Sequence, residues 1–436
     1  MVNRSPQFHL SPGGVLGGEL QVPGDKSISH RALMFGGMAE GTTEISGFLE
    51  GEDCLATLKA LQALGVRIER PGAQRVRVHG AGGRFTAPSG PLDMGNAGTA
   101  MRLFMGLLCG QPFASTLVGD PSLSRRPMER VAGPLRQMGA RIDTQSGLPP
   151  VRLHGGAPLS GIDYTLPLAS AQLKSALLLA GLHASGTTRI TEPAVTRDHT
   201  ERMLRAFGVE VQQQGLTVAV RGGQRLRAAP VAVPGDFSSA AFFLVAGCLA
   251  AEAGLLLRNV GMNPTRTGLI RMLRSMGAQI DVRPGDPHAA EPVADLFVRR
   301  SALRGIRVPE EWVSLAIDEF PVFFIAAAAA EGATEVSGAA ELRVKESDRL
   351  AVMADGLARL GVRNELRADG IVIQGGPIGG GRIDSHGDHR IAMAFAVASL
   401  RAAAAIDIDD VANVATSFPG FADLARSVGL PVEVRD

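Results

Sequence analysis

The sequence predicts an α/β protein of six repeated strand–helix units, arranged as two lobes of three units each. A short pattern, an apolar residue followed by glycine and a second apolar residue, returns six times along the 436 residues, at intervals of 68 to 84 residues. So steady a period across a whole chain indicates repeated structural units. The chain also contains a longer repeat, because the segment Val22–Ser27 returns in similar form as Val233–Ser238. The glycines of the short pattern are Gly65, Gly139, Gly208, Gly277, Gly361 and Gly429.

Each copy of the short pattern has the same local chemistry. Apolar residues before the glycine follow helical spacing, as in Leu58, Leu61 and Leu64, so an amphipathic helix ends there. Glycine suits a helix C-terminus because it adopts a left-handed backbone without steric cost. Alternating segments such as 66–68 after the glycine and 41–45 upstream of the helix predict strands. Each unit is therefore predicted to run strand, loop, helix, strand.

The longer repeat, 22–27 and 233–238, predicts the division into lobes. We expect residues 23–235 to form one lobe, and residues 236–436 to form the other together with an N-terminal strand within residues 1–22. Each lobe then holds three units. A cleft between two lobes is a natural ligand site.

The composition excludes several classes of function. Lys and Arg total 44 against 43 Asp and Glu, so no global field attracts nucleic acid or a membrane surface. The first residues show no basic end followed by an apolar stretch, and the longest apolar runs, 240–251 and 321–330, are shorter than the ~20 residues that span a bilayer. Three scattered cysteines suit a reducing compartment. We therefore expect a cytoplasmic protein, and a monomer.

The segment Pro23–Arg31 predicts an anion site at a helix start. Lys26 and Ser27 fall in the first turn, where free backbone N–H groups and the helix dipole attract phosphate or carboxylate. Arg31 follows Ser27 by four residues and shares its face. Asp25 interrupts the Gly-Lys-Ser order of a nucleotide-binding P-loop, so a nucleotide kinase loses its main support. The alternative is an ordinary solvated helix start.

Four further segments of the first lobe supply similar groups. In Asp93–Arg102 a helix opens on Gly98, which lets a ligand approach the backbone closely. The loop Ser124–Pro127 holds Arg126, although adjacent arginines in a loop are also typical of a solvated surface. Two more helix starts carry polar side chains, namely Ser170 and Gln172 on either side of Ala171 in one and Arg197 in the other.

The second lobe adds acids to the cations. Asp318 precedes the most apolar helix of the chain, where it either takes part in chemistry or only complements the helix dipole. Arg343–Arg349 is expected to open a helix, with Lys345 and Arg349 four residues apart on one face and Glu346 beside them. Arg390 opens another helix.

These helix starts together predict a site for a ligand with several negative charges, with Asp318 and Glu346 as candidates for proton transfer. His386 and His389 lie close together at the helix start that holds Arg390. Two histidines without further ligand spacing do not make a metal site. We expect no metal.

Four of these motifs together resemble the EPSP synthase (3-phosphoshikimate 1-carboxyvinyltransferase) family of enolpyruvyl transferases, over essentially the whole chain. They are Pro23–Arg31, Gly95–Thr99, Arg343–Arg349 and Asp388–Arg390. The resemblance implies two inverse α/β lobes of three repeats each, with the active site in the cleft between them. It also implies transfer of the enolpyruvyl group of phosphoenolpyruvate to shikimate 3-phosphate, without metal or organic cofactor, and a phosphoenolpyruvate site that glyphosate occupies.

The resemblance also implies roles for matching residues. The shikimate 3-phosphate contacts are Lys26, Ser27, Arg31, Ser170, Ala171, Gln172, Arg197, Asp318 and Lys345. The phosphoenolpyruvate contacts are Lys26, Gly98, Arg126, Gln172, Arg349 and Arg390. The catalytic groups are Asp318, Glu346, Lys345 and Lys26. Which acid moves which proton stays open.

The sequence departs from one branch of the family and leaves two alternatives. Ala171 replaces a second serine of that branch, Arg197 lies where it has an aromatic residue nearby, and Thr416–Pro419 lacks a lysine that some members carry. The cation that completes the phosphoenolpyruvate site therefore stays open. The alternatives are the sister enzyme acting on UDP-N-acetylglucosamine, whose usual reactive cysteine is absent from the loop 119–130, and a non-catalytic binder of phosphorylated metabolites.

Overall fold

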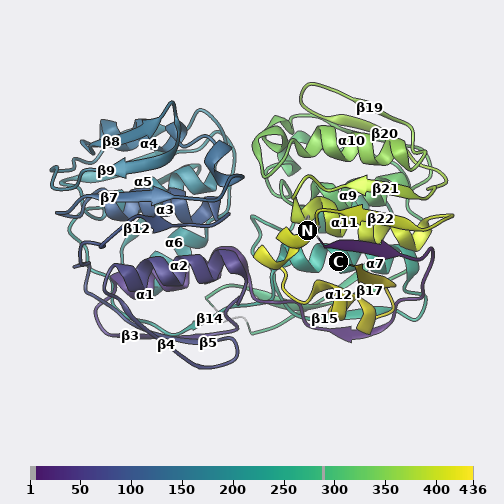
Figure 1. The fold of residues 1–436 in the computed structure, drawn as a ribbon, viewed down its shortest axis with the longest axis horizontal. Helices are drawn as coiled ribbons and strands as arrows, with labels where there is room; N and C mark the ends of the chain where they lie inside the picture. The colour runs from purple at the N-terminus through teal and green to yellow at the C-terminus, as the bar shows by residue number, and fades with distance from the viewer. Residues whose placement is uncertain (1–5, 287–289, 436) are drawn as a thin grey trace, which may run out of the picture. The chain divides into compact units, whose positions relative to one another are not determined.

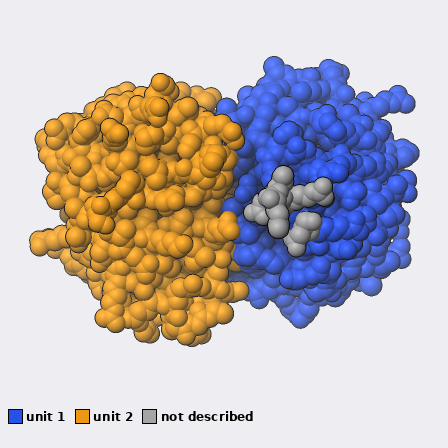
Figure 2. All heavy atoms as spheres, viewed as in Figure 1, with its two compact units in different colours: residues 1–23, 234–436 blue, residues 24–233 orange. Residues whose placement is uncertain are grey.

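The structure, a computed structural model, describes residues 6–286 and 290–435 and consists of two compact units. Unit 1 comprises Met1–Pro23 and Pro234–Asp436, and unit 2 comprises Gly24–Val233 (Figure 2). The division expected from the sequence lies one residue from the first of these boundaries and two from the second. Each unit has a separate core of buried apolar side chains.

Unit 2 contains three sheets, each accompanied by two α-helices, in the part of the chain that the structure describes (Figure 1). Its elements are α1 (Lys26–Met38), β3 (Thr42–Ser46), α2 (Glu52–Ala63), β4 (Arg67–Gly72), β5 (Arg75–His79), β6 (Leu92–Asp93), α3 (Gly98–Leu108), β7 (Ser115–Val118), the 3₁₀-helix η1 (Leu123–Arg125), α4 (Glu129–Gln137), β8 (Ile142–Gln145), β9 (Leu148–Leu153), β10 (Asp163–Thr165), α5 (Ala171–Gly181), β11 (Thr187–Thr191), α6 (His199–Ala206), β12 (Val211–Gln214), β13 (Thr217–Arg221) and β14 (Val231–Ala232).

Unit 1 repeats this architecture and includes the two N-terminal strands. Its elements are β1 (Gln7–Leu10), β2 (Gly18–Leu20), α7 (Phe237–Ala250), β15 (Leu255–Gly261), α8 (Gly268–Ser275), β16 (Gln279–Pro284), β17 (Val293–Arg299), η2 (Glu310–Trp312), α9 (Phe320–Ala328), β18 (Ala333–Val336), η3 (Ala340–Val344), α10 (Arg349–Arg359), β19 (Asn364–Leu366), β20 (Ile371–Gln374), β21 (Gly381–Asp384), α11 (His389–Ala398), η4 (Ser399–Arg401), β22 (Ile406–Asp409), η5 (Ala412–Thr416), α12 (Phe421–Ser427) and β23 (Val432–Arg435).

The sheets share one topology. In each four-stranded sheet a parallel pair is extended on one side by two antiparallel strands, as in the order β14-β3-β5-β4. The fifth repeat, β18-β20-β19, has three antiparallel strands. Strand β1 pairs with both β22 and β23, so the N-terminal strand belongs to the last sheet of unit 1.

The six glycines predicted as helix caps all have a left-handed backbone. Their φ angles lie between +78° and +103°. At the first, the Gly65 N–H donates to Gln62 O at 3.0 Å and the Val66 N–H donates to Leu61 O at 3.0 Å. The other five repeat both hydrogen bonds at the same spacing, a Schellman cap that satisfies carbonyls at the helix end. The predicted period is thus confirmed as a repeated cap.

The structure corrects the content of each unit. A repeat contains two helices, as in β6-α3-β7-α4-β8-β9, whereas the predicted strand, loop, helix and strand describe only its second half. The first helix of each repeat was not predicted as part of the repeated unit, because a helix such as α7, in which every residue is buried, shows no amphipathic stripe. The N-termini of these buried helices carry most of the polar motifs found in the sequence.

Two further expectations concern cysteines and membranes. Cys54, Cys109 and Cys248 are buried cysteines. Burial raises the pKa of Cys109 and of Cys248 to about 12. No helix in the described ranges is long and apolar enough to cross a bilayer.

Candidate active site

Helix α1 begins where the first motif predicted it. The Asp25 side chain caps the helix by accepting the Ile28 N–H at 2.9 Å. Lys26 is the first helical residue, and its Nζ donates to Asp53 Oδ2 at 2.9 Å, with 16% of the lysine side chain and 7% of the aspartate side chain exposed. A partly buried ion pair of this kind fixes the direction of a long lysine side chain at the helix start.

Arg31 is held rigidly inside unit 2. Its Nε donates to Thr200 Oγ1 at 2.7 Å, its Nη2 to Ser175 Oγ at 2.9 Å and its Nη1 to the Ser27 carbonyl at 3.0 Å. The residue is only 3% exposed. Its last contact confirms that Ser27 and Arg31 share one side of α1, while the other two connect α1 to α5 and α6.

Gln172 joins the starts of α3 and α5. Its Oε1 accepts from Arg102 Nη1 at 2.5 Å, and its Nε2 donates to Thr99 Oγ1 at 2.9 Å. Gly98 opens α3 next to them, and a Cβ added there would meet Arg126 Nη1 at 3.1 Å and Arg102 Nη1 at 3.3 Å. The glycine therefore lies directly against two guanidinium groups.

Arg126 is positioned by its own loop and by the loop before α3. Its Nη2 donates to Asn96 Oδ1 at 2.6 Å and to Ser122 Oγ at 3.2 Å. Asn96 in turn donates from Nδ2 to Asp120 Oδ2 at 2.8 Å. Arg126 is 7% exposed, so the alternative of a solvated surface arginine is wrong.

The remaining predicted residues of unit 2 lie at the starts of α5 and α6. Ser170 is the N-cap of α5, where its Oγ accepts the Leu173 N–H at 3.3 Å, and Ala171 is the first residue of the helix. Arg197 is partly exposed and immediately precedes Asp198, the N-cap of α6.

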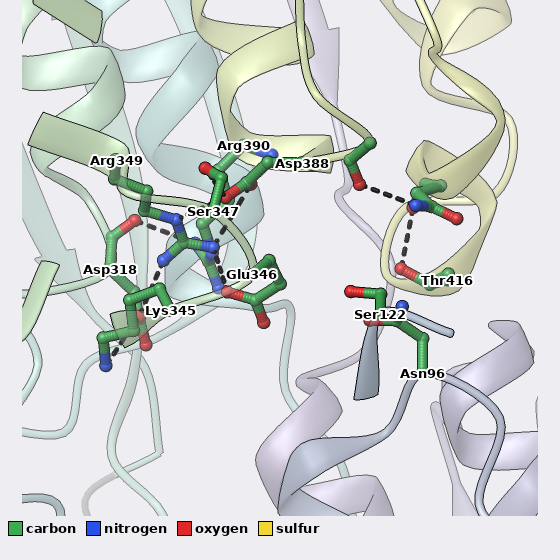
Figure 3. Close-up of polar contacts among 12 residues, drawn as sticks. Asn96, Ser122, Asp318, Lys345, Glu346, Ser347, Arg349, Asp388, Arg390 and Thr416 are labelled. Carbon is green, nitrogen blue, oxygen red and sulfur yellow. Dashed lines mark hydrogen bonds and ion pairs between the residues drawn. The ribbon is translucent and has the colours of Figure 1, made fainter. Parts of the chain in front are cut away.

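Unit 1 gathers three carboxylates around one buried arginine (Figure 3). Arg349 donates from Nε to Asp388 Oδ2 at 2.9 Å, from Nη2 to Glu346 Oε2 at 2.6 Å and from Nη1 to Asp318 Oδ1 at 3.2 Å. Burial alone would lower the pKa of Arg349, but the nearby charges of Asp388, Glu346 and Asp318 outweigh it and raise the pKa. The guanidinium is therefore a fixed cation that aligns three acids.

Two more cations contact Asp318. Lys345 Nζ lies 3.6 Å from Asp318 Oδ1, and Arg390 Nη1 donates to the Asp318 carbonyl at 3.1 Å. The prediction that Lys345 and Arg349 share a helix face is wrong, because Lys345 is the C-cap of η3 and α10 starts only at Arg349. They converge through Asp318 instead.

Thr416, which stands near the position of the missing lysine, is buried and bonded to backbone. Its Oγ1 donates to Asn413 O at 2.7 Å, and Asn413 Nδ2 donates to the Gly387 carbonyl at 2.6 Å (Figure 3). These hydrogen bonds support the turn before Asp388, so Thr416 has a structural role in this chain.

Sequence reasoning missed several residues that hold the site. Asp388 lies in a motif that was identified, but only Arg390 was selected from it, although Asp388 is fully buried against Arg349. Asn96 and Arg102 also lay within an identified motif. Lys174 lay within the identified segment 169–175, but its buried ion pairs were not predictable because Glu192 and Glu201 are far away in the sequence. Within residues 6–286 and 290–435, no three His, Cys, Asp or Glu side chains are grouped so as to hold a metal ion.

Comparison with known proteins identifies the family of this chain. Residues 10–424 match the profile of EPSP synthase (3-phosphoshikimate 1-carboxyvinyltransferase). The chain belongs to the EPSP synthase family. It is 60% identical over 430 residues to the 3-phosphoshikimate 1-carboxyvinyltransferase of Halorhodospira halophila, covering 98% of this chain and 97% of that one. The Methylococcus capsulatus protein of the same name is 56% identical over 436 residues, with both chains covered completely.

Solved structures of this family show the same fold. An EPSP synthase from Acinetobacter baumannii superposes with a TM-score of 0.88 at 52% identity, covering 99% of this chain and 100% of that chain. The expected α/β fold of repeated strand–helix units is thereby confirmed.

Proposed function

We propose that this chain transfers the enolpyruvyl group of phosphoenolpyruvate to the 5-hydroxyl of shikimate 3-phosphate by addition and elimination. In the addition, C3 of phosphoenolpyruvate gains a proton and the 5-hydroxyl oxygen attacks C2 as it loses its own proton. In the elimination, the C2–O bond to phosphate breaks and C3 gives up a proton. The products are 5-enolpyruvylshikimate 3-phosphate and inorganic phosphate. Membership of the EPSP synthase family supports this proposal.

The arrangement around Arg349 is the structural observation that carries the proposal. A binder of anions needs cations, but it does not need Asp318 and Glu346 aligned on the same guanidinium. In the proposed reaction Asp318 or Lys345, 3.6 Å apart, accepts the proton of the hydroxyl, and Glu346 delivers a proton to C3. Proton transfer by positioned groups contributes roughly 10²–10⁴ to the rate.

The proposed contacts with the two anionic substrates come from residues of both units. We assign shikimate 3-phosphate to the unit 2 residues Lys26, Ser27, Arg31, Ser170, Ala171, Gln172 and Arg197, and to Asp318 and Lys345 of unit 1. We assign phosphoenolpyruvate to Lys26, Gly98, Arg126 and Gln172 of unit 2 and to Arg349 and Arg390 of unit 1. Arginine suits carboxylate and phosphate because its planar fork of donors matches two oxygens at once.

One assay tests the proposal. The protein is mixed with phosphoenolpyruvate and shikimate 3-phosphate, and release of inorganic phosphate and formation of the enolpyruvyl ether are measured together. The control replaces shikimate 3-phosphate by UDP-N-acetylglucosamine, the acceptor of the sister enzyme. Turnover with UDP-N-acetylglucosamine but not with shikimate 3-phosphate would favour the sister activity. Binding of phosphoenolpyruvate and shikimate 3-phosphate without phosphate release would indicate a non-catalytic binder.

A further inference from the structure

A buried ion cluster in unit 2 lies outside the assigned contacts. Lys174 Nζ lies 2.7 Å from Glu192 Oε2 and 2.7 Å from Glu201 Oε1. The side chains of Lys174, Glu192 and Glu201 are 2%, 8% and 1% exposed. Burial alone would lower the pKa of Lys174, but the two glutamates outweigh it and raise the pKa, so the lysine is charged.

Stability alone does not explain such a cluster. Removing charges from water is costly, and replacing a buried ion triad by apolar residues of similar volume is often neutral or stabilising. Two glutamates facing one lysine also repel each other. A buried network of this kind has a clearer use in fixing the register of the elements that it connects, because it tolerates few alternative arrangements.

The three residues connect the segments that carry the assigned shikimate 3-phosphate contacts. Lys174 lies one turn into α5, and its N–H donates to the carbonyl of Ser170 at 3.0 Å. Glu201 lies in the first turn of α6, just after Arg197. Glu192 follows β11 and accepts a hydrogen bond from Thr196, which directly precedes Arg197. One lysine therefore reaches the helix start that holds Ser170 and the segment that holds Arg197.

A second contact next to the cluster involves Arg31. Ser175 and Thr200, the chain neighbours of Lys174 and Glu201, form a hydrogen bond of 2.7 Å between their hydroxyl oxygens. Both hydroxyls accept from Arg31, at 2.9 Å and 2.7 Å. The spacing of α5 and α6 that the ion cluster sets is thus the spacing that Arg31 requires.

We propose that Lys174, with Glu192 and Glu201, is a positioning residue that aligns Ser170, Arg197 and Arg31 for the phosphorylated substrate. It touches no reacting atom. This inference rests on the proposed function, because it concerns the binding of shikimate 3-phosphate. Small displacements of positioning groups carry large costs in sites of this kind.

The test separates alignment from stability. Lys174→Met alone strands two buried carboxylates and is expected to lower the melting temperature, so the decisive variant is Lys174→Met/Glu192→Met/Glu201→Met, which replaces the whole cluster by unbranched apolar side chains. We expect this variant to melt near the wild-type temperature, to bind shikimate 3-phosphate at least roughly tenfold more weakly in calorimetry, and to keep kcat within roughly threefold at saturation.

A matched control and a milder variant keep the test decisive. Leu179→Ala removes a fully buried side chain from the far half of α5, so it should lower the melting temperature and leave the dissociation constant within roughly twofold of wild type. Should the triple variant not fold, Thr196→Val removes only the bond to Glu192 and should weaken shikimate 3-phosphate by roughly threefold to tenfold.

The outcomes are distinct. A folded triple variant, or failing that a folded Thr196→Val, with unchanged affinity would overturn the positioning role. Equal weakening by Leu179→Ala would overturn it as well. If the wild-type chain itself neither bound shikimate 3-phosphate nor released phosphate, the proposed function would fail instead.

Discussion

The first helices of the two units, α1 and α7, start from nearly the same sequence and differ in the residues after the cap. Both are capped by the aspartate of a Val-Pro-Gly-Asp segment, Asp25 in α1 and Asp236 in α7. The next residue is Lys26, paired with Asp53, in α1, whereas it is the fully buried Phe237 in α7. The two helices thus share the capping aspartate and differ in the residue that follows it.

The same contrast continues along the helices. Counting from the caps, Arg31 of α1 matches Phe242 of α7, and His30 matches Ala241. Arg31 bonds to α5 and α6, while Phe242 is buried in the apolar core of unit 1. The repeat therefore keeps the residues that fold a unit. Cationic side chains stand at helix starts in both units, for example Lys26 of α1 and Arg349 of α10, whereas the candidate acids Asp318 and Glu346 lie in the loops before α9 and α10 of unit 1.

The largest expected effect comes from the acids of unit 1. Asp318→Ala and Glu346→Gln each remove a group proposed for proton transfer, so kcat should fall by roughly 10²–10⁴. Glu365→Gln, an exposed carboxylate of the same unit on β19, is the control and should stay within roughly twofold. Steady-state phosphate release measures all three. Near-normal turnover by both acid variants would break the assignment of acids to unit 1.

The next effect tests the residue at which the first helices diverge. Lys26→Met removes a charged hydrogen-bond donor, which is worth about 1.5–3 kcal/mol, so kcat/KM should fall by roughly 10- to 100-fold. The matched change in α7, Phe237→Leu, should alter stability and leave kcat/KM unchanged. Since Lys26→Met also strands Asp53, the double variant with Asp53→Asn should recover stability without recovering activity. If the two single variants behaved alike in the activity assay, the contrast between α1 and α7 would carry no chemistry.

A smaller effect is expected at the start of α3, the first helix of the second repeat of unit 2. Gly98→Ala places a methyl 3.1 Å from Arg126 Nη1 and 3.3 Å from Arg102 Nη1. Overpacking costs about 1–3 kcal/mol, and the longer glyphosate molecule should suffer more than phosphoenolpyruvate. We expect glyphosate to inhibit the protein, and inhibition to weaken at least roughly tenfold in Gly98→Ala, with a smaller rise of the KM for phosphoenolpyruvate.

Gly133→Ala in α4 is the control for this variant, because its added methyl would find only the Glu129 side chain at 3.9 Å. Inhibition and substrate titrations of the three proteins decide the matter. Equal changes in both constants for Gly98→Ala would show that this glycine does not discriminate by length.

The smallest effect, on stability rather than on turnover, is expected at His30, whose counterpart Ala241 cannot titrate. Burial, with the charges of Lys26 and Arg31, lowers the pKa of His30 from 6.5 to about 3. The folded state therefore holds a neutral ring, and its stabilising contribution is present above pH 6.5 and is lost as the pH falls towards 3. Between about pH 7 and about pH 5 the wild type should lose up to about 2 kcal/mol more unfolding free energy than His30→Asn.

Urea unfolding at several pH values measures this difference. Asparagine is the appropriate replacement because Thr57 Oγ1 lies 2.7 Å from His30 Nδ1, the ring atom that an asparagine side chain best imitates. Parallel stability curves for the two proteins would contradict the prediction.

The sequence predicted features that a local pattern controls. The six glycine caps were predictable because each needs a left-handed backbone within one turn of a visible apolar stripe. Helix starts such as those of Lys26 and Gly98 were predictable because each has turn residues directly before a helical segment. The buried helices of each repeat were not predictable as parts of the repeat, because a helix such as α7 is apolar all round and shows no period.

The supports of the site depend on long-range contacts. Lys174 meets Glu192 and Glu201, which are 18 and 27 residues away in the sequence, and only the packing of α5 against its neighbours reveals that these charges are buried together. Asp388 was visible in a motif, but its full burial against Arg349 depends on how α10 and α11 pack. Sequence patterns therefore predict which side chains start helices better than which partners hold them.

The buried cysteines make the natural chain a ready background for site-directed labelling. The thiols of Cys109 and Cys248, with pKa values of about 12, contain almost no thiolate near neutral pH, and thiolate is the form that maleimides and methanethiosulfonates attack. Cys54 is fully buried, which keeps these reagents away from its thiol. Cysteines introduced at exposed positions, for instance Leu216 in unit 2 and Leu366 in unit 1, would thus take up nitroxide labels selectively. Pulsed electron resonance on that doubly labelled protein would measure the label separation with and without each substrate, with the native thiols left in place.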